Sequence, residues 1–198
     1  MMRMARLLVL ALVVIAAPVS AEDDQELRRL LFEDPESPVL GNAQGDVTIV
    51  EFFDYRCPYC RKVAPDLAAL LDRDPGVRLV YKEWPILGRS SMVAARGALA
   101  AHLQGFYAPV HEALMKGELD LDDDAIVAFA VSLGANAEQM RADMTSKRVT
   151  QALMRNNDVA RALGVTGTPA FVIGDTLVPG AVSLEQLEAV VAKARAGS

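Results

Sequence analysis

Both cysteines of the 198-residue chain lie in one tetrapeptide, CPYC at positions 57–60, and the segments around it constrain the fold more than any other feature. Directly before it, VTIVEFF (47–53) is a near-continuous apolar and β-branched run, typical of a strand covered on both faces. After Cys57, Pro58 suits the first turn of a helix, and RKVAPDLAALL continues at helical spacing with a kink expected at Pro65. A second strand, VRLVYKEW (77–84), follows, so these segments predict a right-handed parallel βαβ unit. The two thiols are therefore expected at the start of its helix.

The spacing of the two cysteines favours reversible redox chemistry. On a helix, residues three apart share a face, which brings the sulfur atoms of Cys57 and Cys60 within disulfide distance. Unpaired backbone N–H groups and the helix dipole favour a thiolate at Cys57, whereas Cys60 lies one turn further in and is expected to be more shielded. A free thiol with a pKa near 8.5 is only about 3% ionised at pH 7, while CxxC sites reach pKa values of roughly 3.5 to 7.5. The pattern predicts that Cys57 attacks and Cys60 resolves.

Other uses of two neighbouring thiols are less favoured. A structural disulfide that closes so small a loop would add only about 2 kcal/mol. A zinc site needs two more ligands, and the two histidines, His102 and His111, are nine residues apart with no carboxylate pattern beside them. Both histidines are therefore expected to be ordinary helix residues, and no metal or cofactor is expected. Binding of Cu(I) by the two thiolates stays open as an alternative.

Two charged residues interrupt the apolar runs of the predicted strands. Glu51 is either a strand-end carboxylate that reaches solvent or a partly buried acid beneath the thiols that accepts or relays a proton. Lys82, on the neighbouring strand, is either the counter-charge of Glu51 or a surface lysine whose apolar stem packs along the protein. The residues alone leave these alternatives open.

The chain outside the βαβ unit divides into a leader, an arm, a helical block and a C-terminal segment. Residues 1–21 place Arg3 and Arg6 before a short apolar run and small residues, which predicts a cleavable secretory signal peptide. Without it, 18 basic and 26 acidic residues leave a net charge of −8, so nucleic acid is not an expected partner. A helical arm is expected over 22–38 and helices over 90–163. Residues 164–198 predict two strands and a helix capped by Ser183.

Segments in several places resemble one family. CPYCRKVAP, with its proline eight residues after the first cysteine, resembles the active-site helix of the thioredoxin superfamily. GVTGTPAFVIGDTLVPGAV (164–182) is similar to its cis-proline strand and hairpin, and YKEWPILGRSSMVAARGALAA (81–101) resembles the DsbA-like branch. Glutaredoxins share the CPYC tetrad, but Cys57 and Pro169 stand 112 positions apart, which is too far for a minimal glutaredoxin. The resemblance implies an α/β thioredoxin fold over 39–89 and 164–198 with an inserted helical domain over 90–163.

The resemblance also assigns roles to individual residues. It makes Cys57 the nucleophile, Cys60 the resolving thiol and Glu51 a buried acid. In the family, an extended client segment pairs with the backbone beside a cis-proline. The substrate-facing surface that this implies consists of Pro58, Tyr59, Thr168 and Pro169.

The activity that the resemblance implies is thiol:disulfide exchange in the periplasm. Its clients would be unfolded or partly folded exported proteins, and a membrane protein of the DsbB-like or DsbD-like kind would be its redox partner. The best-known DsbA oxidases carry His at the position of Tyr59 and Val at that of Thr168. Tyrosine at position 59 indicates a redox potential that is less oxidising than that of those oxidases. Threonine before the proline is a feature in which this chain resembles disulfide isomerases and ScsC-type proteins. The direction of exchange, oxidase against isomerase or reductase, stays open, as does the oligomeric state.

Overall fold

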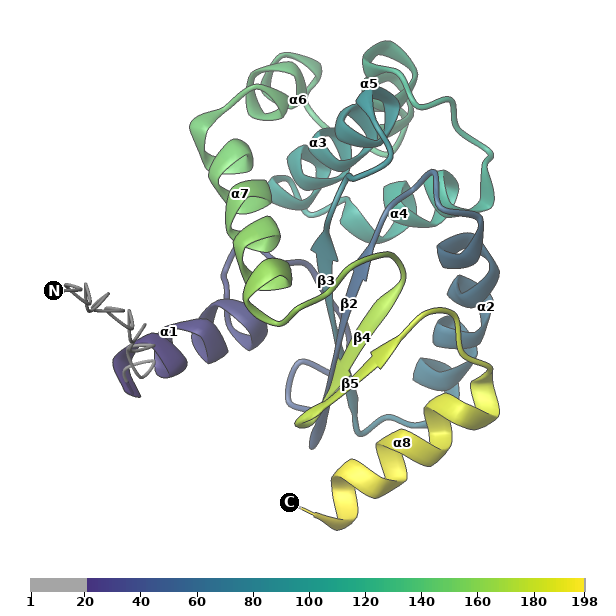
Figure 1. The fold of residues 1–198 in the computed structure, drawn as a ribbon. Coiled ribbons are helices and arrows are strands. Elements are labelled where there is room, and N and C mark those ends of the chain that lie inside the picture. The colour runs from purple at the N-terminus through teal and green to yellow at the C-terminus, as the bar shows by residue number, and fades with distance from the viewer. Residues whose placement is uncertain (1–20, 198) are drawn as a thin grey trace, which may run out of the picture.

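A computed structural model describes residues 21–197, so the predicted signal peptide (1–21) lies outside the described residues apart from Ala21. At its centre is a five-stranded sheet in the order β1-β3-β2-β4-β5 (Figure 1). β2 and β3 run parallel and the other three neighbouring pairs are antiparallel, which confirms the predicted βαβ unit. The strands are β1 (Val39–Gly41), β2 (Val47–Phe53), β3 (Val77–Glu83), β4 (Ala170–Ile173) and β5 (Thr176–Pro179).

The described part of the chain contains eight helices. Four of them begin with an N-cap residue whose side chain accepts a hydrogen bond from a backbone N–H of the first turn. These N-cap residues are Asp122 for α5, Asn136 for α6, Ser146 for α7 and Ser183 for α8. The predicted Ser183 cap is confirmed. Between Ala21 and Gly197 no helix combines the length and apolar character needed to cross a bilayer. The helices are α1 (Ala21–Phe32), α2 (Pro58–Arg73), α3 (Arg89–Leu103), α4 (Tyr107–Lys116), α5 (Asp123–Ser132), α6 (Ala137–Met144), α7 (Lys147–Ala162) and α8 (Leu184–Ala196).

The two central strands are covered on both faces, as their continuous apolar runs predict. On one face, Ile49 and Phe53 pack into the core that α2 and α8 cover. On the other face, Val50 and Phe52 pack into a second core with residues of α1 and α7. Because successive side chains of a strand alternate, Glu51 belongs to the α2 face.

Helices α3 to α6 gather beyond the ends to which the arrows of β2 and β3 point (Figure 1). Helix α7 instead runs back along the sheet, where Val159 and Ala160 pack with Phe52. The last helix of the predicted helical block thus also covers the sheet. The division into a thioredoxin domain and an inserted helical domain stays a prediction, and strand β1, which pairs with β3, was not anticipated.

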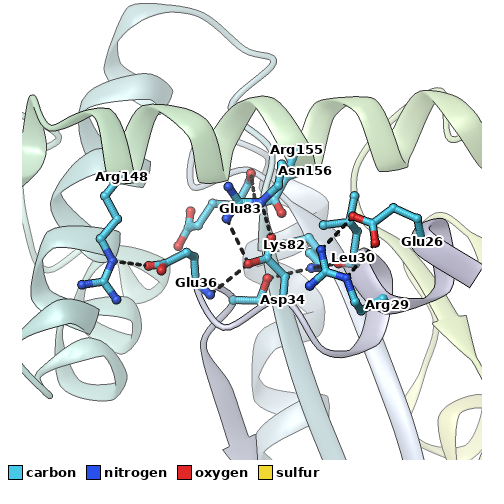
Figure 2. A network of polar contacts seen from close by, with 11 residues as sticks. Glu26, Arg29, Leu30, Asp34, Glu36, Lys82, Glu83, Arg148, Arg155 and Asn156 are labelled. Carbon is cyan, nitrogen blue, oxygen red and sulfur yellow. Dashed lines mark hydrogen bonds and ion pairs between the residues drawn. The ribbon is translucent and has the colours of Figure 1, made fainter.

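Lys82 holds the N-terminal arm against the face of the sheet that α1 and α7 cover. Its side chain is fully buried (0% exposed), and Nζ donates to the Leu30 carbonyl at 2.6 Å (Figure 2). Nζ also donates to Ser37 Oγ at 2.6 Å. Both expectations for Lys82 are therefore wrong, since it neither pairs with Glu51 nor reaches the surface. The reason is the alternation of strand side chains, which sends the two residues to opposite faces. Burial lowers the pKa of Lys82 to about 8, although the charge of Asp34 acts in the other direction.

An ion pair joins the same arm to α7. Asp34 is buried and accepts two hydrogen bonds from the Arg155 guanidinium, at 2.7 and 3.0 Å, and one from the Glu36 N–H at 3.0 Å (Figure 2). Burial raises the pKa of the Asp34 carboxyl, but the bonds from Arg155 and from the Glu36 backbone outweigh it, so the pKa lies below its usual value. The arm is thus fixed by charge as well as by apolar packing.

We expect Asp34→Asn to lower the free energy of unfolding by about 2 kcal/mol at pH 7. This is less than the ~3–5 kcal/mol lost when one of two fully buried charges is left alone, because Arg155 stays partly exposed. A lowered carboxyl pKa stabilises the fold above the unfolded value near 3.9, so the gap between wild type and variant should narrow as the pH falls below about 4. Urea denaturation at several pH values measures it. Arg28→Gln, which removes the exposed pair with Asp175, is the control and should leave the midpoint unchanged.

Candidate active site

The turn between β2 and α2 presents Cys57 as the N-cap residue of α2, with extended backbone angles (φ −74°, ψ 117°) and Pro58 in the first helical position. Asp54 fixes this turn, because its Oδ1 accepts the Arg56 N–H at 2.8 Å and its Oδ2 accepts the Leu87 N–H at 2.9 Å. The Arg56 guanidinium donates to the Leu87 carbonyl at 2.6 Å. The predicted placement of Cys57 at the helix start is confirmed, and the turn is tied to the loop that follows β3.

Cys57 occupies an environment that favours its thiolate. The residue is 4% exposed, and its Sγ donates to the Thr168 carbonyl at 3.2 Å. Burial raises the pKa of the Cys57 thiol, but hydrogen bonds from the Thr168 side chain, from the Cys60 backbone and thiol and from the Tyr59 backbone together lower it below its usual value. Cys57 is thus the more readily ionised of the two thiols.

Cys60 and Glu51 share the opposite environment. Cys60 is fully buried, and burial together with the charge of Glu51 raises the pKa of its thiol far above the usual value. Glu51 is 1% exposed, and burial, with a contribution from the charge of Cys57, raises the pKa of its carboxyl to about 8. Glu51 Oε1 has no hydrogen-bond partner among the described residues. The solvent-reaching alternative for Glu51 is therefore wrong, and a buried acid lies beneath the thiols.

The predicted substrate-facing residues border Cys57. The Thr168–Pro169 peptide bond is cis, and Thr168 is the residue whose carbonyl contacts Cys57. Tyr59 is 62% exposed and Pro58 is also exposed, whereas Pro169 is buried. Ile86 and Leu87, from the loop tied to the turn, are exposed apolar side chains. The site thus combines a reactive sulfur with an open rim.

A second buried polar group next to the site was not anticipated. The hydroxyl groups of Tyr55 and Tyr107 both donate to Glu83 Oε1, at 2.8 and 3.0 Å. Both hydroxyl groups also contact His111 Nδ1, at 3.0 and 3.3 Å, so His111 is not the ordinary helix residue that was expected. We call these four residues the tyrosine cluster. The two-residue alternation of β3 could have placed Glu83 on the face of Glu51, but no sequence pattern brings α4 there.

We searched the described residues for side chains that could bind a metal ion together. Within residues 21–197, no three His, Cys, Asp or Glu side chains gather in a way that could hold a metal ion. Burial lowers the pKa of His111 to about 3, so its imidazole is neutral, but its Nδ1 is occupied by the two tyrosines.

Comparison with solved structures finds proteins of the same architecture. A thioredoxin-like oxidoreductase from Silicibacter pomeroyi DSS-3 is 48% identical, with 86% of this chain and 99% of that chain covered and a TM-score of 0.81. A periplasmic thioredoxin-like protein from Salmonella enterica serovar Typhimurium is 36% identical, with coverage of 91% and 99% and a TM-score of 0.77. The catalytic domain of Proteus mirabilis ScsC is 31% identical, with coverage of 87% and 96% and a TM-score of 0.76. The expected thioredoxin fold of DsbA-like type is confirmed.

Comparison of sequences gives the same result. The family model described as the DSBA-like thioredoxin domain matches residues 48–192. The chain is also 29% identical, over 162 residues, to a Na(+)/H(+) antiporter, NhaA 1 of Salinispora arenicola. That match covers 81% of this chain but only 25% of the antiporter, so the chain spans about a quarter of that relative's length.

We expect the two thiols to titrate far apart. In a Cys60→Ser variant, alkylation of Cys57 by iodoacetamide should reach half its maximal rate below pH 8.5, the usual thiol pKa, because hydrogen bonds stabilise its thiolate. In a Cys57→Ser variant, Cys60 should stay almost unreactive up to pH 9, because its thiol is buried above Glu51. Equal midpoints for the two cysteines would contradict the assignment of separate environments.

Proposed function

Since the chain belongs to the DSBA-like thioredoxin domain family of thiol:disulfide oxidoreductases, we propose that Cys57 and Cys60 exchange disulfides with exported proteins in the periplasm. The observation that carries this proposal is the contrast between the two thiols. Cys57 lies at a helix start with its pKa lowered, and Cys60 lies buried behind it with its pKa raised. An attacking sulfur and a protected resolving sulfur need these two environments.

Exchange in the oxidising direction begins from a disulfide between Cys57 and Cys60. A client thiolate attacks Cys57 Sγ, and Cys60 leaves as a thiolate that must take up a proton. A second client thiolate then attacks the client sulfur of the mixed disulfide, which releases Cys57 as a thiolate and the client as a disulfide. In the reducing direction Cys57 attacks a client disulfide and Cys60 attacks Cys57. We assign Glu51 as the buried acid that exchanges the proton with Cys60, because its carboxyl is buried and its charge acts directly on that thiol.

Clients bind, in this proposal, across the rim of Cys57. An extended segment lies beside the cis peptide bond of Thr168–Pro169 and over the exposed Pro58 and Tyr59. Unfolded or partly folded exported proteins supply such segments. The signal-peptide pattern of residues 1–21 and the similar periplasmic protein from Salmonella enterica support a periplasmic location. A membrane protein of the DsbB-like or DsbD-like kind would restore the redox state of the pair.

The direction of exchange depends on how strongly the Cys57 thiolate is stabilised. Tyr59 points into solvent and carries no charge that could stabilise the thiolate, so we propose a mild oxidant with isomerase or reductase activity of the ScsC type. Copper(I) chelation is the weaker alternative, because it needs both thiolates and burial above Glu51 opposes ionisation of Cys60.

Cys60→Ser should trap mixed disulfides between Cys57 and client proteins, because attack remains while resolution is lost. The measurement is non-reducing electrophoresis of the purified variant after incubation with unfolded exported proteins that carry disulfides. Cys57→Ser is the matched control and should give no adducts. Absence of adducts with Cys60→Ser would contradict the proposed function.

Two substitutions at the rim should move the redox potential in opposite directions. Thr168→Val removes a hydroxyl that lowers the pKa of Cys57, so the reduced form loses stability and the pair becomes less oxidising, opposite to the shift toward oxidation that the valine of the DsbA oxidases suggests. Tyr59→His adds a group that can stabilise the thiolate, so the pair becomes more oxidising. Each tenfold change in the equilibrium constant corresponds to about 30 mV. Equilibration with glutathione measures both, and shifts of the same sign would refute the assignment.

A further inference from the structure

The tyrosine cluster is a closed chain of hydrogen bonds built by three separate elements. Tyr55 comes from the turn before α2, Glu83 ends β3, and Tyr107 and His111 lie one turn apart on α4. All four are buried, and two parallel branches join Glu83 to His111, one through each tyrosine. Such a chain can pass a proton from one end to the other when each hydroxyl group accepts one proton and releases another.

One end of the chain lies next to Glu51. In the parallel register of β2 and β3, Glu51 is paired with Tyr81 and Phe53 is paired with Glu83, so the two acids are diagonal neighbours on one face. Glu83 Oε2 and Glu51 Oε1 are both buried, and neither has a hydrogen-bond partner among the described residues. Neighbouring strands lie about 4.8 Å apart and rise about 3.3 Å per residue, so diagonal neighbours are about 8 Å apart at the backbone, a separation that two glutamate side chains, or one water between them, can span.

The other end of the chain lies at the protein surface. His111 lines a groove of about 710 Å³ between α2 and α4, whose charged border includes Arg61, Glu112 and Lys116. Nδ1 of His111 takes the tyrosine contacts. Nε2 has no protein partner among residues 21–197 and is not among the buried unpaired atoms, so it is the nitrogen available to water in the groove.

We propose that the tyrosine cluster is a proton route that connects Glu51 and the buried Cys60 thiol with water in the groove between α2 and α4. The inference rests on the proposed function, because only exchange at Cys60 requires such a route. Each reduction of the pair delivers one proton to Cys60, and each oxidation removes one. Cys60 has no exposed surface through which either could pass.

The transfer balances proton by proton during reduction of the pair. His111 takes a proton at Nε2 from groove water and gives its Nδ1 proton to a tyrosine oxygen, whose own proton moves to Glu83 Oε1. Glu83, protonated on Oε2, releases that proton to Glu51, and Glu51 protonates the Cys60 thiolate. Oxidation runs the same steps backwards and restores the starting tautomer of His111.

The protonation states of the described groups agree with this scheme. Burial raises the pKa of Glu83 well above its usual value, which favours the protonated carboxyl, and burial lowers the pKa of His111 to about 3, so His111 is neutral at pH 7. Burial likewise keeps the tyrosine hydroxyl groups protonated. The other titratable groups that act on Glu83 or Glu51 are Asp54, Cys57 and Tyr81.

A small aromatic disulfide that releases a coloured thiol serves as the substrate of the test, because it lets attack by Cys57 and resolution by Cys60 be followed separately. With reduced protein, attack by Cys57 releases one coloured thiol, and resolution by Cys60 releases the second. In His111→Ala we expect the first phase to be unchanged and the second to slow about tenfold, at the low end of typical proton-transfer contributions. Added imidazole should restore the second phase, because it can occupy the vacated position and carry the proton.

The tyrosines provide a matched series. Tyr55→Phe and Tyr107→Phe should each slow the second phase less than twofold, since the other branch remains, and the double variant should match His111→Ala. Tyr81→Phe is the control, because its ring lies 4.3 Å from that of His111 while its hydroxyl bonds to none of the four residues. It should leave both phases unchanged.

Two results would overturn the route. A second phase that is unchanged in His111→Ala and in the double variant would show that the proton reaches Cys60 another way. A slowed second phase that imidazole does not restore, or an equal slowing of both phases, would assign the cluster a packing role. Loss of the first phase in the wild type would instead refute the proposed function.

Discussion

Burial of a thiol and a carboxyl group together behind the start of α2 is the constraint on which the rest of the site depends. Cys57 and Cys60 are separated by one helical turn, yet hydrogen bonds at the helix start favour charge on the first, and burial disfavours charge on the second. Glu51 deepens that difference, because its own charge would raise the pKa of Cys60 further. The strands and helices around the pair keep water from the second sulfur while leaving the first at an open rim.

Strand alternation places the ionisable groups buried in the central strands on two different faces of the sheet. Glu51 and Glu83 lie on the α2 face, and Lys82, between them in the register, lies on the face of α1 and α7. A lysine beside Glu51 would stabilise the carboxylate and lower its pKa, and Glu51 would then no longer carry a proton near neutral pH. The same alternation gives Lys82 a separate task, since it satisfies a carbonyl and a hydroxyl of the arm that would otherwise be buried unpaired.

Local patterns in the sequence were enough to predict most of the fold. The run 47–53, Pro58 and the Ser183 cap each act within a few residues, and the structure has a strand, a helix start and a capping box there. The tyrosine cluster could not be predicted, because it depends on the register of β2 with β3 and on where α4 packs. The prediction for Lys82 was wrong for a related reason. The face to which its side chain points follows from the alternation of side chains along the strand, whereas the prediction considered only the usual exposure of lysine and its charge.

The hydrogen bonds of Asp54 and Arg56 with Leu87 tie the turn that carries Cys57 to the loop between β3 and α3. Leu87 lies two residues before the start of α3, and both of its backbone groups are held by the turn that positions Cys57. The same few hydrogen bonds therefore fix both the turn that carries the reactive sulfur and the point from which the chain enters α3.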